Sequence, residues 1–459
     1  MPQTPAAQDA HYRHATQAQV EQLLRKKNYH SLTLPDGTAI PGLIPVEALE
    51  RRIRAFPIPE LLAGRRVLDV GAASGWNSIE MARRGAEVMA IDCVEFEELR
   101  TATELFNLPI DYRILDVDEL DRALVGDFDY VLFLGVLYHL RHPLLALEKI
   151  CALTRETAFV ESFVTDSEGA PSDACTLEFY ETDQLGGQID NWFGPTAKCL
   201  VALCRSAGFV RVKLEYIATE RRAGVTCHRR WEAEPGSSNF EPAWLYSAVN
   251  NRTNDIVFHT GKDEYLCIYF RSAEADLTPD RMRIEVDGYG VNALTLHNPG
   301  KGDWQVNSRL PPGLAPGEHA VRLRTDATRF GNEFRIQLRD SRSQPAPVDA
   351  PPAMATAVQP PPVIFLLENS LDRSQTMHGY RSERLVCRFR GAPRNLSREA
   401  VFARLDEQSI PVSFLTDLAH GEWQANMELP RDLAPGSHAI CIRTVASGWS
   451  DPAEFLFEP

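Results

Sequence analysis

Glycines and acids in the first half of the chain have the types and spacing of a nucleotide-binding site. Gly71 and Gly75 frame a turn that directly follows the apolar run of residues 67–70. Glycines let a ligand lie against bare backbone near the beginning of a helix, where free N–H groups attract polar groups. Asp92 follows Gly71 by 21 residues, the spacing at which an acid accepts hydrogen bonds from ribose hydroxyls. The pattern predicts that the chain binds an adenosine-containing cofactor.

The elements that must position these residues alternate between strands and helices. Apolar runs predict strands at residues 67–70, 87–91, 112–115, 130–134 and 158–164. Helical periodicity begins at Trp76 and stops at Gly85, and Pro45, Pro143 and Pro195 begin further predicted helices. Residues 209–216 and 225–229 are predicted to close the sheet as an antiparallel hairpin, and residues 165–194 to form a long polar loop.

Four of the candidate residues end successive predicted strands. Asp69, Asp92, Asp116 and Gly135 occupy these positions. The carboxyl ends of parallel strands share one edge of an open α/β sheet, and that edge is where ligands bind. The order of elements therefore predicts a single site at this edge.

The motifs at this edge resemble class I S-adenosylmethionine-dependent methyltransferases. The resemblance rests on residues 68–75, on Asp92 and Asp116, and on Gly135-Val136-Leu137-Tyr138-His139-Leu140, and it extends over about residues 28–232. The turn departs from the family at Ala73, where glycine is usual. We expect this alanine to narrow the turn without abolishing it.

A narrower resemblance is to the wobble-uridine carboxymethyltransferase group of tRNA enzymes. It rests on residues 135–139, on Glu161-Ser162-Phe163-Val164, and on Asn191-Trp192-Phe193-Gly194-Pro195.

The broader resemblance implies a Rossmann-like fold with S-adenosylmethionine as cofactor and no metal. It implies that the cofactor is held by Asp69, Gly71, Ala73, Gly75, Asp92, Cys93, Asp116, Val117 and Gly135.

Methyl transfer needs positioning of donor and acceptor, and sometimes removal of a proton. His139 follows the fourth strand beside the expected sulfonium, so we consider it a candidate base, with Tyr138 as its catalytic neighbour. The alternative is that His139 only shapes the loop through hydrogen bonds. Trp192 is predicted to form a wall of the acceptor pocket, or else a hydrophobic plug beneath the long loop.

Tyr138 and Arg222 also match the positions that hold the extra carboxylate of carboxy-S-adenosylmethionine in the tRNA enzymes. Those enzymes use a lysine from the N-terminal segment as a third contact, and residues 29–56 contain no lysine. Arg51, Arg52 and Arg54 are cations of that segment, but none aligns with the lysine. We therefore expect ordinary S-adenosylmethionine as the donor.

The second half of the chain contains an internal repeat. Residues 304–325 match residues 423–444 at 13 of 22 positions, with an offset of 119. Short alternating runs with turns about every ten residues predict two all-β immunoglobulin-like sandwiches. Trp304 and Trp423 occupy equivalent positions and are predicted to be core residues rather than ligand platforms.

The whole chain is thus predicted to be an α/β Rossmann-like methyltransferase sheet followed by two immunoglobulin-like β-sandwiches. The predicted segments are an N-terminal helical cap at 1–60, a methyltransferase domain at 61–235, sandwiches at 251–340 and 363–459, and a proline-rich linker at 341–362.

Charge and composition limit the partners of the protein. The net charge is −15, which opposes binding to the phosphates of RNA. The chain has no apolar run long enough to span a bilayer, and its nine cysteines include no Cys-x-x-Cys pair. We expect a cytoplasmic protein with reduced thiols, no metal cluster and no membrane contact.

The sequence therefore favours a methyltransferase that modifies a hydroxyl or similar group of a small molecule or glycan. One alternative is a tRNA wobble-uridine methyltransferase or carboxymethyltransferase. The second is a non-catalytic adaptor whose repeats are binding modules. In every case the repeats are predicted to recruit a substrate or protein partner, or to mediate self-association.

Overall fold

The computed structural model describes residues 16–25, 28–167, 169–238, 240–253, 255–262, 264–300, 302–341 and 360–458, the last range without 370–373, 379–383, 393–395, 397, 407, 420, 428, 431, 432 and 446. The chain divides into two compact units. One contains residues 1–245, 270–315 and 320–333, and the other contains residues 246–269, 316–319 and 334–459. Within the described ranges, no helix is long and apolar enough to cross a membrane.

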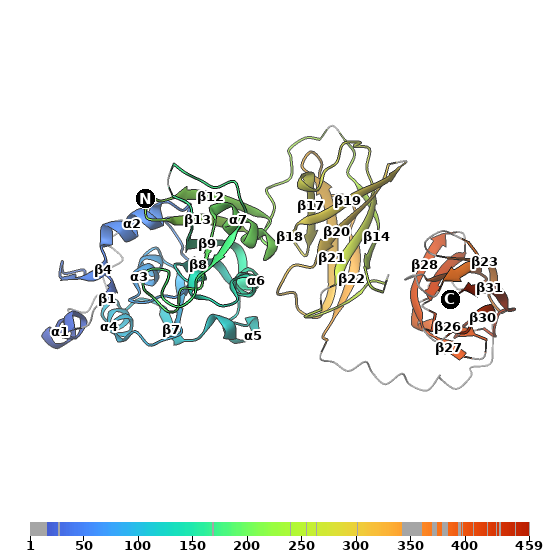
Figure 1. Ribbon diagram of the computed structural model, residues 1–459, viewed down its shortest axis with the longest axis horizontal. Coiled ribbons are helices and arrows are strands. Elements are labelled where there is room, and N and C mark those ends of the chain that lie inside the picture. The colour runs from blue at the N-terminus through green and yellow to red at the C-terminus, as the bar shows by residue number, and fades with distance from the viewer. Residues whose placement is uncertain are drawn as a thin grey trace. The chain divides into compact units, whose positions relative to one another are not determined.

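A seven-stranded sheet with the order β12-β13-β9-β8-β5-β6-β7 is the framework of the first unit (Figure 1). Neighbouring strands from β9 to β7 run parallel, whereas β13 runs antiparallel to both β9 and β12. The strands are β5 (Arg66–Val70), β6 (Glu87–Asp92), β7 (Ile110–Ile114), β8 (Phe128–Leu134), β9 (Thr154–Phe163), β12 (Arg211–Ile217) and β13 (Arg222–His228). The structure confirms the predicted mixed sheet and its terminal hairpin.

Helices cover both faces of this sheet. They are α3 (Trp76–Arg83), α4 (Glu97–Phe106), α5 (Arg122–Val125), α6 (Pro143–Leu153) and α7 (Ala197–Ser206), with short 3-10 turns η2 (Val117–Glu119) and η3 (Leu137–His139). Alternating strand residues face opposite sides. Leu68 packs in one core with α6 and α7, and Val67 packs in the other core with α3 and α4.

The N-terminal segment also packs against the sheet. It consists of α1 (Gln17–Arg25), β1 (Asn28–His30), β2 (Leu32–Thr33), β3 (Ala39–Ile40), β4 (Gly42–Ile44) and α2 (Val46–Arg54). Leu23, Leu49 and Ile53 join the core on the α3 side of the sheet. Phe56 extends this contact, because its ring meets the ring of Phe159 edge-on at a centroid distance of 5.6 Å. The segment is thus part of the core of this unit.

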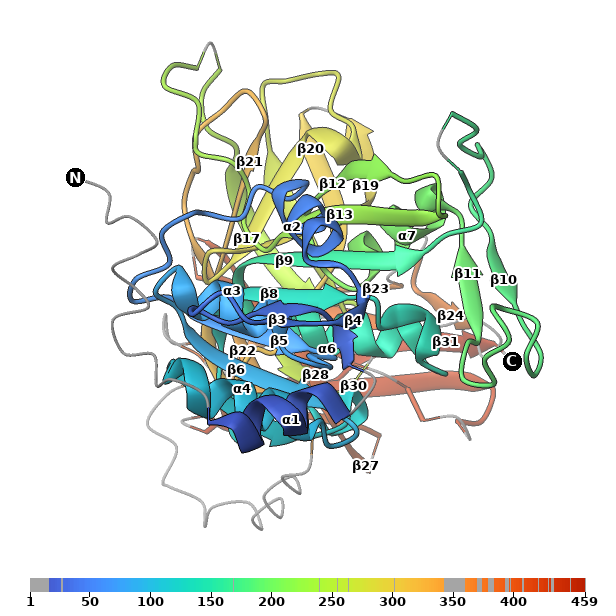
Figure 2. The same cartoon turned by 90° about the vertical axis from the view of Figure 1, so that its left-hand side faces the viewer.

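The segment of residues 165–194, predicted to be a long polar loop, includes short strands. It contains β10 (Leu177–Phe179), which pairs antiparallel with β11 (Phe193–Pro195), and this hairpin extends away from the sheet (Figure 2). The Phe179 ring packs on the rings of Trp192 and Phe193 at centroid distances of 6.4 and 5.6 Å. Cross-strand aromatic pairs stabilise these three-residue strands, which are too short to show a period of two in the sequence.

The repeated half folds twice with the same topology. The first repeat has sheets β14-β16-β20-β19 and β15-β22-β21-β17-β18, and the second has β23-β25-β29-β28 and β24-β31-β30-β26-β27. Trp304 and Trp423 are both 5% exposed, which confirms that they are core residues. The predicted repeat is therefore a structural duplication.

The strands of the first repeat are β14 (Trp244–Asn250), β15 (Val257–His259), β16 (Tyr265–Arg271), β17 (Met282–Val286), β18 (Tyr289–Val291), β19 (Ala293–Gly300), β20 (Asp303–Arg309), β21 (Gly317–Thr325) and β22 (Phe334–Arg339). Those of the second are β23 (Val363–Asn369), β24 (Thr376–His378), β25 (Leu385–Arg390), β26 (Val401–Leu405), β27 (Gln408–Ile410), β28 (Val412–Ala419), β29 (Glu422–Met427), β30 (Gly436–Thr444) and β31 (Ala453–Glu458). The predicted linker lies largely outside the described residues, and the predicted domain boundaries stay predictions.

Gly224 of β13 allows the N-terminal segment to pack closely on the sheet. A Cβ atom at this position would overlap the Tyr216 ring and lie 2.7 Å from Cζ of Phe56. We expect Gly224→Ala to lower the free energy of unfolding by about 1–3 kcal/mol, because the added methyl group overpacks this contact. Denaturant unfolding of the full chain measures the effect.

Gly236→Ala is the matched control for this substitution. A Cβ atom at Gly236 would have no neighbour within 4 Å, so its effect should stay within about 0.5 kcal/mol. Equal stability of the two variants would contradict the proposed packing constraint.

Candidate functional site

The glycine turn is shaped by positive backbone angles and by close neighbours. Gly71 and Gly75 have φ angles of 72° and 85°, which glycine adopts without strain. A Cβ atom at Gly71 would overlap Val136, and one at Gly75 would overlap Leu99. No other residue fits these two positions without displacing its neighbour. The turn therefore presents bare backbone at the beginning of α3, as the sequence predicts.

Ala73 completes the turn in a strained conformation. Its φ angle is 48°, a left-handed value that few non-glycine residues adopt. Its backbone N–H donates to Oδ2 of Asp92 over 3.0 Å. The turn thus keeps its shape with alanine in place of the family's usual glycine.

Asp92 and Cys93 lie beside this turn at the end of β6. Burial raises the pKa of Asp92, while hydrogen bonds from the backbone N–H groups of Ala73 and Val94 oppose the shift. The Cys93 side chain is exposed. Asp92 is therefore at the predicted edge, with an oxygen near the turn.

Asp69 and Asp116 have mainly structural contacts. The buried Asp69 carboxylate accepts a 2.6 Å hydrogen bond from the hydroxyl of Ser78 on α3. Asp116 caps η2 by accepting from the N–H of Asp118. Val117 belongs to the hydrophobic core. These three residues hold the edge in shape, and nothing in their contacts assigns them to a ligand.

Tyr138 and His139 lie together on η3, with ring centroids 4.3 Å apart. Nδ1 of His139 lies 3.4 Å from Oδ2 of Asp190, an electrostatic contact that lacks hydrogen-bond geometry. Burial lowers the pKa of His139, and the Asp190 carboxylate opposes this shift. The imidazole is therefore neutral near pH 7, the form that can accept a proton.

Arg222, which is half-buried, forms an ion pair with the buried Glu161 at the same edge. Its Nε and Nη2 atoms donate to the two carboxylate oxygens of Glu161 over 2.6 and 2.5 Å. Its guanidinium also lies over the Tyr138 ring, 4.9 Å from the centroid. Burial disfavours the charge of Arg222, but Glu161 outweighs burial and raises the pKa of Arg222. Gly135 borders this group with a φ angle of 81°.

Trp192 joins the β10–β11 hairpin to η3. Its backbone N–H donates to the carbonyl oxygen of Tyr138 over 2.8 Å. The Arg141 guanidinium lies 4.6 Å from the centroid of its ring. The structure thus brings Trp192 next to Tyr138 and His139. This position agrees with a pocket wall as well as with a plug.

Four residues of this edge were not predicted from the sequence as site residues. Tyr29 donates its backbone N–H to the Ser74 hydroxyl over 2.9 Å and so fastens the N-terminal segment to the turn. Glu161 and Asp190 are the partners of Arg222 and His139. Spacing along the chain gives no sign of these pairs, because each joins residues from separate elements.

Arg52 is the fourth missed residue. Its charge acts on His30, Asp69 and Tyr216, which places the guanidinium near the turn. Its Nε and Nη2 atoms are buried and have no hydrogen-bond partner among the described residues. Helical spacing could have distinguished Arg52 from Arg51 and Arg54, because position 52 lies three residues after the buried Leu49.

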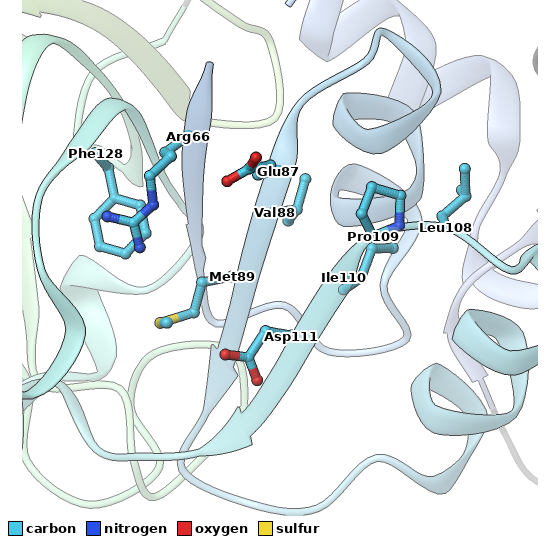
Figure 3. A pocket seen from close by; sticks show the side chains of 9 residues that line it. All are labelled: Arg66, Glu87, Val88, Met89, Leu108, Pro109, Ile110, Asp111 and Phe128. Carbon is cyan, nitrogen blue, oxygen red and sulfur yellow. The ribbon is translucent and has the colours of Figure 1, made fainter. Parts of the chain in front are cut away.

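A pocket of about 440 Å³ lies away from this edge (Figure 3). Its lining includes Arg66, Glu87 and Ile110, which are the first residues of β5, β6 and β7. It therefore lies at the amino ends of the strands, whereas the candidate site lies at their carboxyl ends. Over the described part of the chain, no group of three His, Cys, Asp or Glu side chains could hold a metal ion.

Comparisons with known proteins agree with this fold. Residues 44–212 match the family described as a methyltransferase domain. The tRNA U34 carboxymethyltransferase of Azotobacter vinelandii is 36% identical over 166 residues, which cover 34% of this chain and 49% of the relative. The ubiquinone biosynthesis O-methyltransferase of Xanthomonas oryzae pv. oryzae is 41% identical over 95 residues, which cover 20% and 38%. The chain thus spans half or less of the length of these relatives.

A solved structure of the N-terminal domain of EvdMO1 with SAH bound aligns with 46% of this chain and 94% of its own, at 21% identity and a TM-score of 0.37. The match of residues 44–212 to a methyltransferase domain agrees with the predicted enzyme class and with S-adenosylmethionine as its cofactor. The free backbone at Gly71 and Gly75 and the carboxylate of Asp92 fit S-adenosylmethionine.

The buried Asp69 carboxylate should make stability depend on pH. Burial raises the pKa of Asp69 from 3.8 to about 6, with Ser78 and Arg52 opposing the shift. Between these pH values the folded chain holds a proton that the unfolded chain has lost, so this contribution to stability falls as the pH rises. His30 acts in the opposite direction, because burial lowers its pKa to about 3.

Comparison with Asp69→Asn isolates the carboxylate from such opposing groups. From pH 4 to pH 7 the free energy of unfolding of the variant should rise relative to that of the unmodified chain by about 2–3 kcal/mol. Denaturant unfolding across this range measures the difference. Asp111→Asn, which alters an exposed carboxylate, should follow the unmodified chain. Parallel curves for the Asp69 variant would disprove the raised pKa.

Proposed function

We propose, from the premise that residues 44–212 are a class I S-adenosylmethionine-dependent methyltransferase domain, that the chain methylates a hydroxyl group of a small molecule or glycan. The supporting observation is the pair of His139 and Asp190 beside Tyr138, 3.4 Å apart at the carboxyl edge of the sheet. A hydroxyl acceptor must lose a proton during methyl transfer, and this pair supplies a neutral base.

The glycine turn and Asp92 hold the cofactor in this proposal. S-adenosylmethionine supplies an electrophilic methyl group when bound. Gly71, Ala73 and Gly75 provide backbone against which its nucleoside portion lies, and Asp92 accepts hydrogen bonds from its ribose. Cys93 borders the ribose acid. Asp69, Asp116, Val117 and Gly135 keep these groups in place.

His139 acts as the general base and Tyr138 orients it. The neutral imidazole takes up the proton of the hydroxyl group that is methylated, and Asp190 stabilises the imidazolium that results. Trp192 forms the wall against which a planar acceptor packs. These groups come from η3 and from the β10–β11 hairpin, so the hairpin completes the acceptor side of the site.

Ordinary S-adenosylmethionine is the expected donor because Arg222 already binds a carboxylate. Both oxygens of Glu161 receive hydrogen bonds from this guanidinium. A carboxylated donor would bring a second anion next to the buried Glu161. Arg52 has buried nitrogen atoms without a described hydrogen-bond partner, and its charge acts on Asp69 and Tyr216.

The net charge of −15 favours a small acceptor over tRNA. The runner-up remains a tRNA-modifying enzyme, which the relative from Azotobacter vinelandii and the match at Tyr138 and Arg222 favour. We also propose that the duplicated repeats are immunoglobulin-like sandwiches, because each pairs a four-stranded with a five-stranded sheet.

Asp92→Ala should weaken the affinity for S-adenosylmethionine about ten- to hundredfold, because it removes charge-assisted hydrogen bonds to the ribose. Calorimetric titration of the full chain measures this affinity. Asp111→Ala removes a carboxylate near the amino end of β7 and serves as the control, with an unchanged affinity expected. An unchanged affinity in the Asp92 variant would exclude Asp92 as the ribose acid.

The acceptor class is tested with S-adenosylmethionine that carries a labelled methyl group. The full chain is incubated separately with the small-molecule fraction and the tRNA fraction of a cell extract. We expect label in the small-molecule fraction, at a rate about a hundredfold or more lower for His139→Gln. Label in tRNA would instead support the runner-up. An unaltered rate for the His139 variant would remove the base from the mechanism.

A further inference from the structure

The two repeats differ on the outward face of one sheet. In the first repeat, β17 and β21 pair Arg283 with Arg324 and Glu285 with Arg322. Because alternate strand residues share a face, these four side chains lie together, opposite the buried Ile284. They form a charged surface with both signs of charge.

This surface in the first repeat is covered by an extended segment of the same unit. The Trp231 indole N–H donates to the carbonyl oxygen of Ile284 over 2.8 Å, and the Arg283 guanidinium lies 4.5 Å from the Trp231 ring centroid. Oε1 of Glu232 lies 2.6 Å from Nε of Arg283 and 3.3 Å from Nη2 of Arg324. Covering leaves Arg324 only 1% exposed.

The second repeat carries a different set at the equivalent positions. The equivalent positions lie 119 residues later in the chain. Those of Arg283, Glu285, Arg322, Arg324 and Phe330 hold Phe402, Arg404, Cys441, Arg443 and Trp449, respectively. We call Phe402, Arg404, Arg443 and Trp449 the second-repeat face. Strand register confirms that it is one surface, since β26 and β30 pair Phe402 with Arg443 and Arg404 with Cys441.

The second-repeat face is cationic and aromatic. The Arg443 guanidinium lies 4.6 Å from the Phe402 ring centroid and 5.2 Å from that of Trp449, and the Arg404 guanidinium lies 4.9 Å from that of Trp449. The acid of the first repeat, Glu285, is replaced by Arg404. Neither arginine forms an ion pair with a described residue, and their Nε atoms are buried without a hydrogen-bond partner there.

The chain does not supply the equivalent covering pair by sequence. Positions 350 and 351, which correspond to Trp231 and Glu232, are alanine and proline. Arg443 occupies the position of Arg324, which contacts Glu232 in the first repeat, and Arg404 lies beside it. No described residue supplies an anion to these two arginines. Guanidinium groups held on aromatic rings are pre-organised to bind a carboxylate with two parallel hydrogen bonds.

We propose that the second-repeat face binds an extended acidic segment of a partner protein, with an aromatic residue next to a carboxylate. The occupant of the equivalent surface, Trp231-Glu232, gives the kind of partner: its ring packs on a guanidinium and its carboxylate joins two arginines. Charge complementarity supports this choice, because the face carries two cations with no described counter-ion.

The test uses the full chain and a labelled synthetic peptide with the sequence of residues 231–236, Trp-Glu-Ala-Glu-Pro-Gly. Fluorescence anisotropy should show saturable binding that weakens with added salt. Arg404→Glu should weaken it at least tenfold. This variant copies the residue of the first repeat, so it should fold, which thermal unfolding checks. A peptide with both glutamates changed to glutamine should bind equally weakly to the unmodified chain and to the Arg404→Glu variant.

Arg390→Glu is the matched control, since it makes the same charge change on β25 in the other sheet of this repeat. Its affinity for the peptide should stay within twofold of that of the unmodified chain. The proposal is overturned if the peptide shows no saturable binding up to about 1 mM, or if Arg404→Glu binds it as tightly as the control. Sedimentation velocity measures whether the chain associates with itself. Self-association that Arg404→Glu abolishes would make a second copy of the chain the occupant and would also overturn the proposal.

Discussion

The lack of side chains at Gly71 and Gly75 is the constraint on which the candidate site depends. The space that a Cβ atom would need is filled by Val136 at one glycine and by Leu99 at the other. Val136 immediately precedes η3, which carries Tyr138, so contact with the turn fixes the position of the catalytic candidates. A bulkier turn would move the predicted cofactor side and the predicted acceptor side of the candidate site apart.

Charge at the same edge is balanced by short contacts between elements. Glu161 would be an uncompensated buried anion without Arg222, and loss of one member of such a pair costs far more than an exposed pair contributes. The Asp69 carboxylate instead accepts a hydrogen bond from the Ser78 hydroxyl, and burial raises its pKa to about 6 against the effect of this bond. The candidate site therefore combines one strongly paired acid on β9 with one that is readily protonated on β5, and β8 separates the two strands.

Features that depend on residues close together in the chain were predicted correctly from the sequence. The glycine turn, the strand that ends at Asp92 and the core position of Trp304 follow from residue type and spacing, and the structure contains each of them. The β10–β11 hairpin was missed because aromatic contacts across it, not periodicity, hold it together. The pairing of Arg222 with Glu161 was missed because 61 residues separate the partners and only the sheet register brings them together.

The two repeats agree at positions that the fold constrains and differ at positions on the surface. Asp287 and Asp406 occupy equivalent turns of the two repeats, with φ angles of 51° and 50°. Each carboxylate accepts a hydrogen bond from the backbone N–H of an alanine that follows a histidine, Ala320 in the first repeat and Ala439 in the second. Inward positions must fit two sheets at once, so a change there leaves a cavity or a clash. Outward positions such as Glu285 and Arg404 meet only what covers them. A change from acid to base there alters the charge a covering segment must carry while the strand order stays the same.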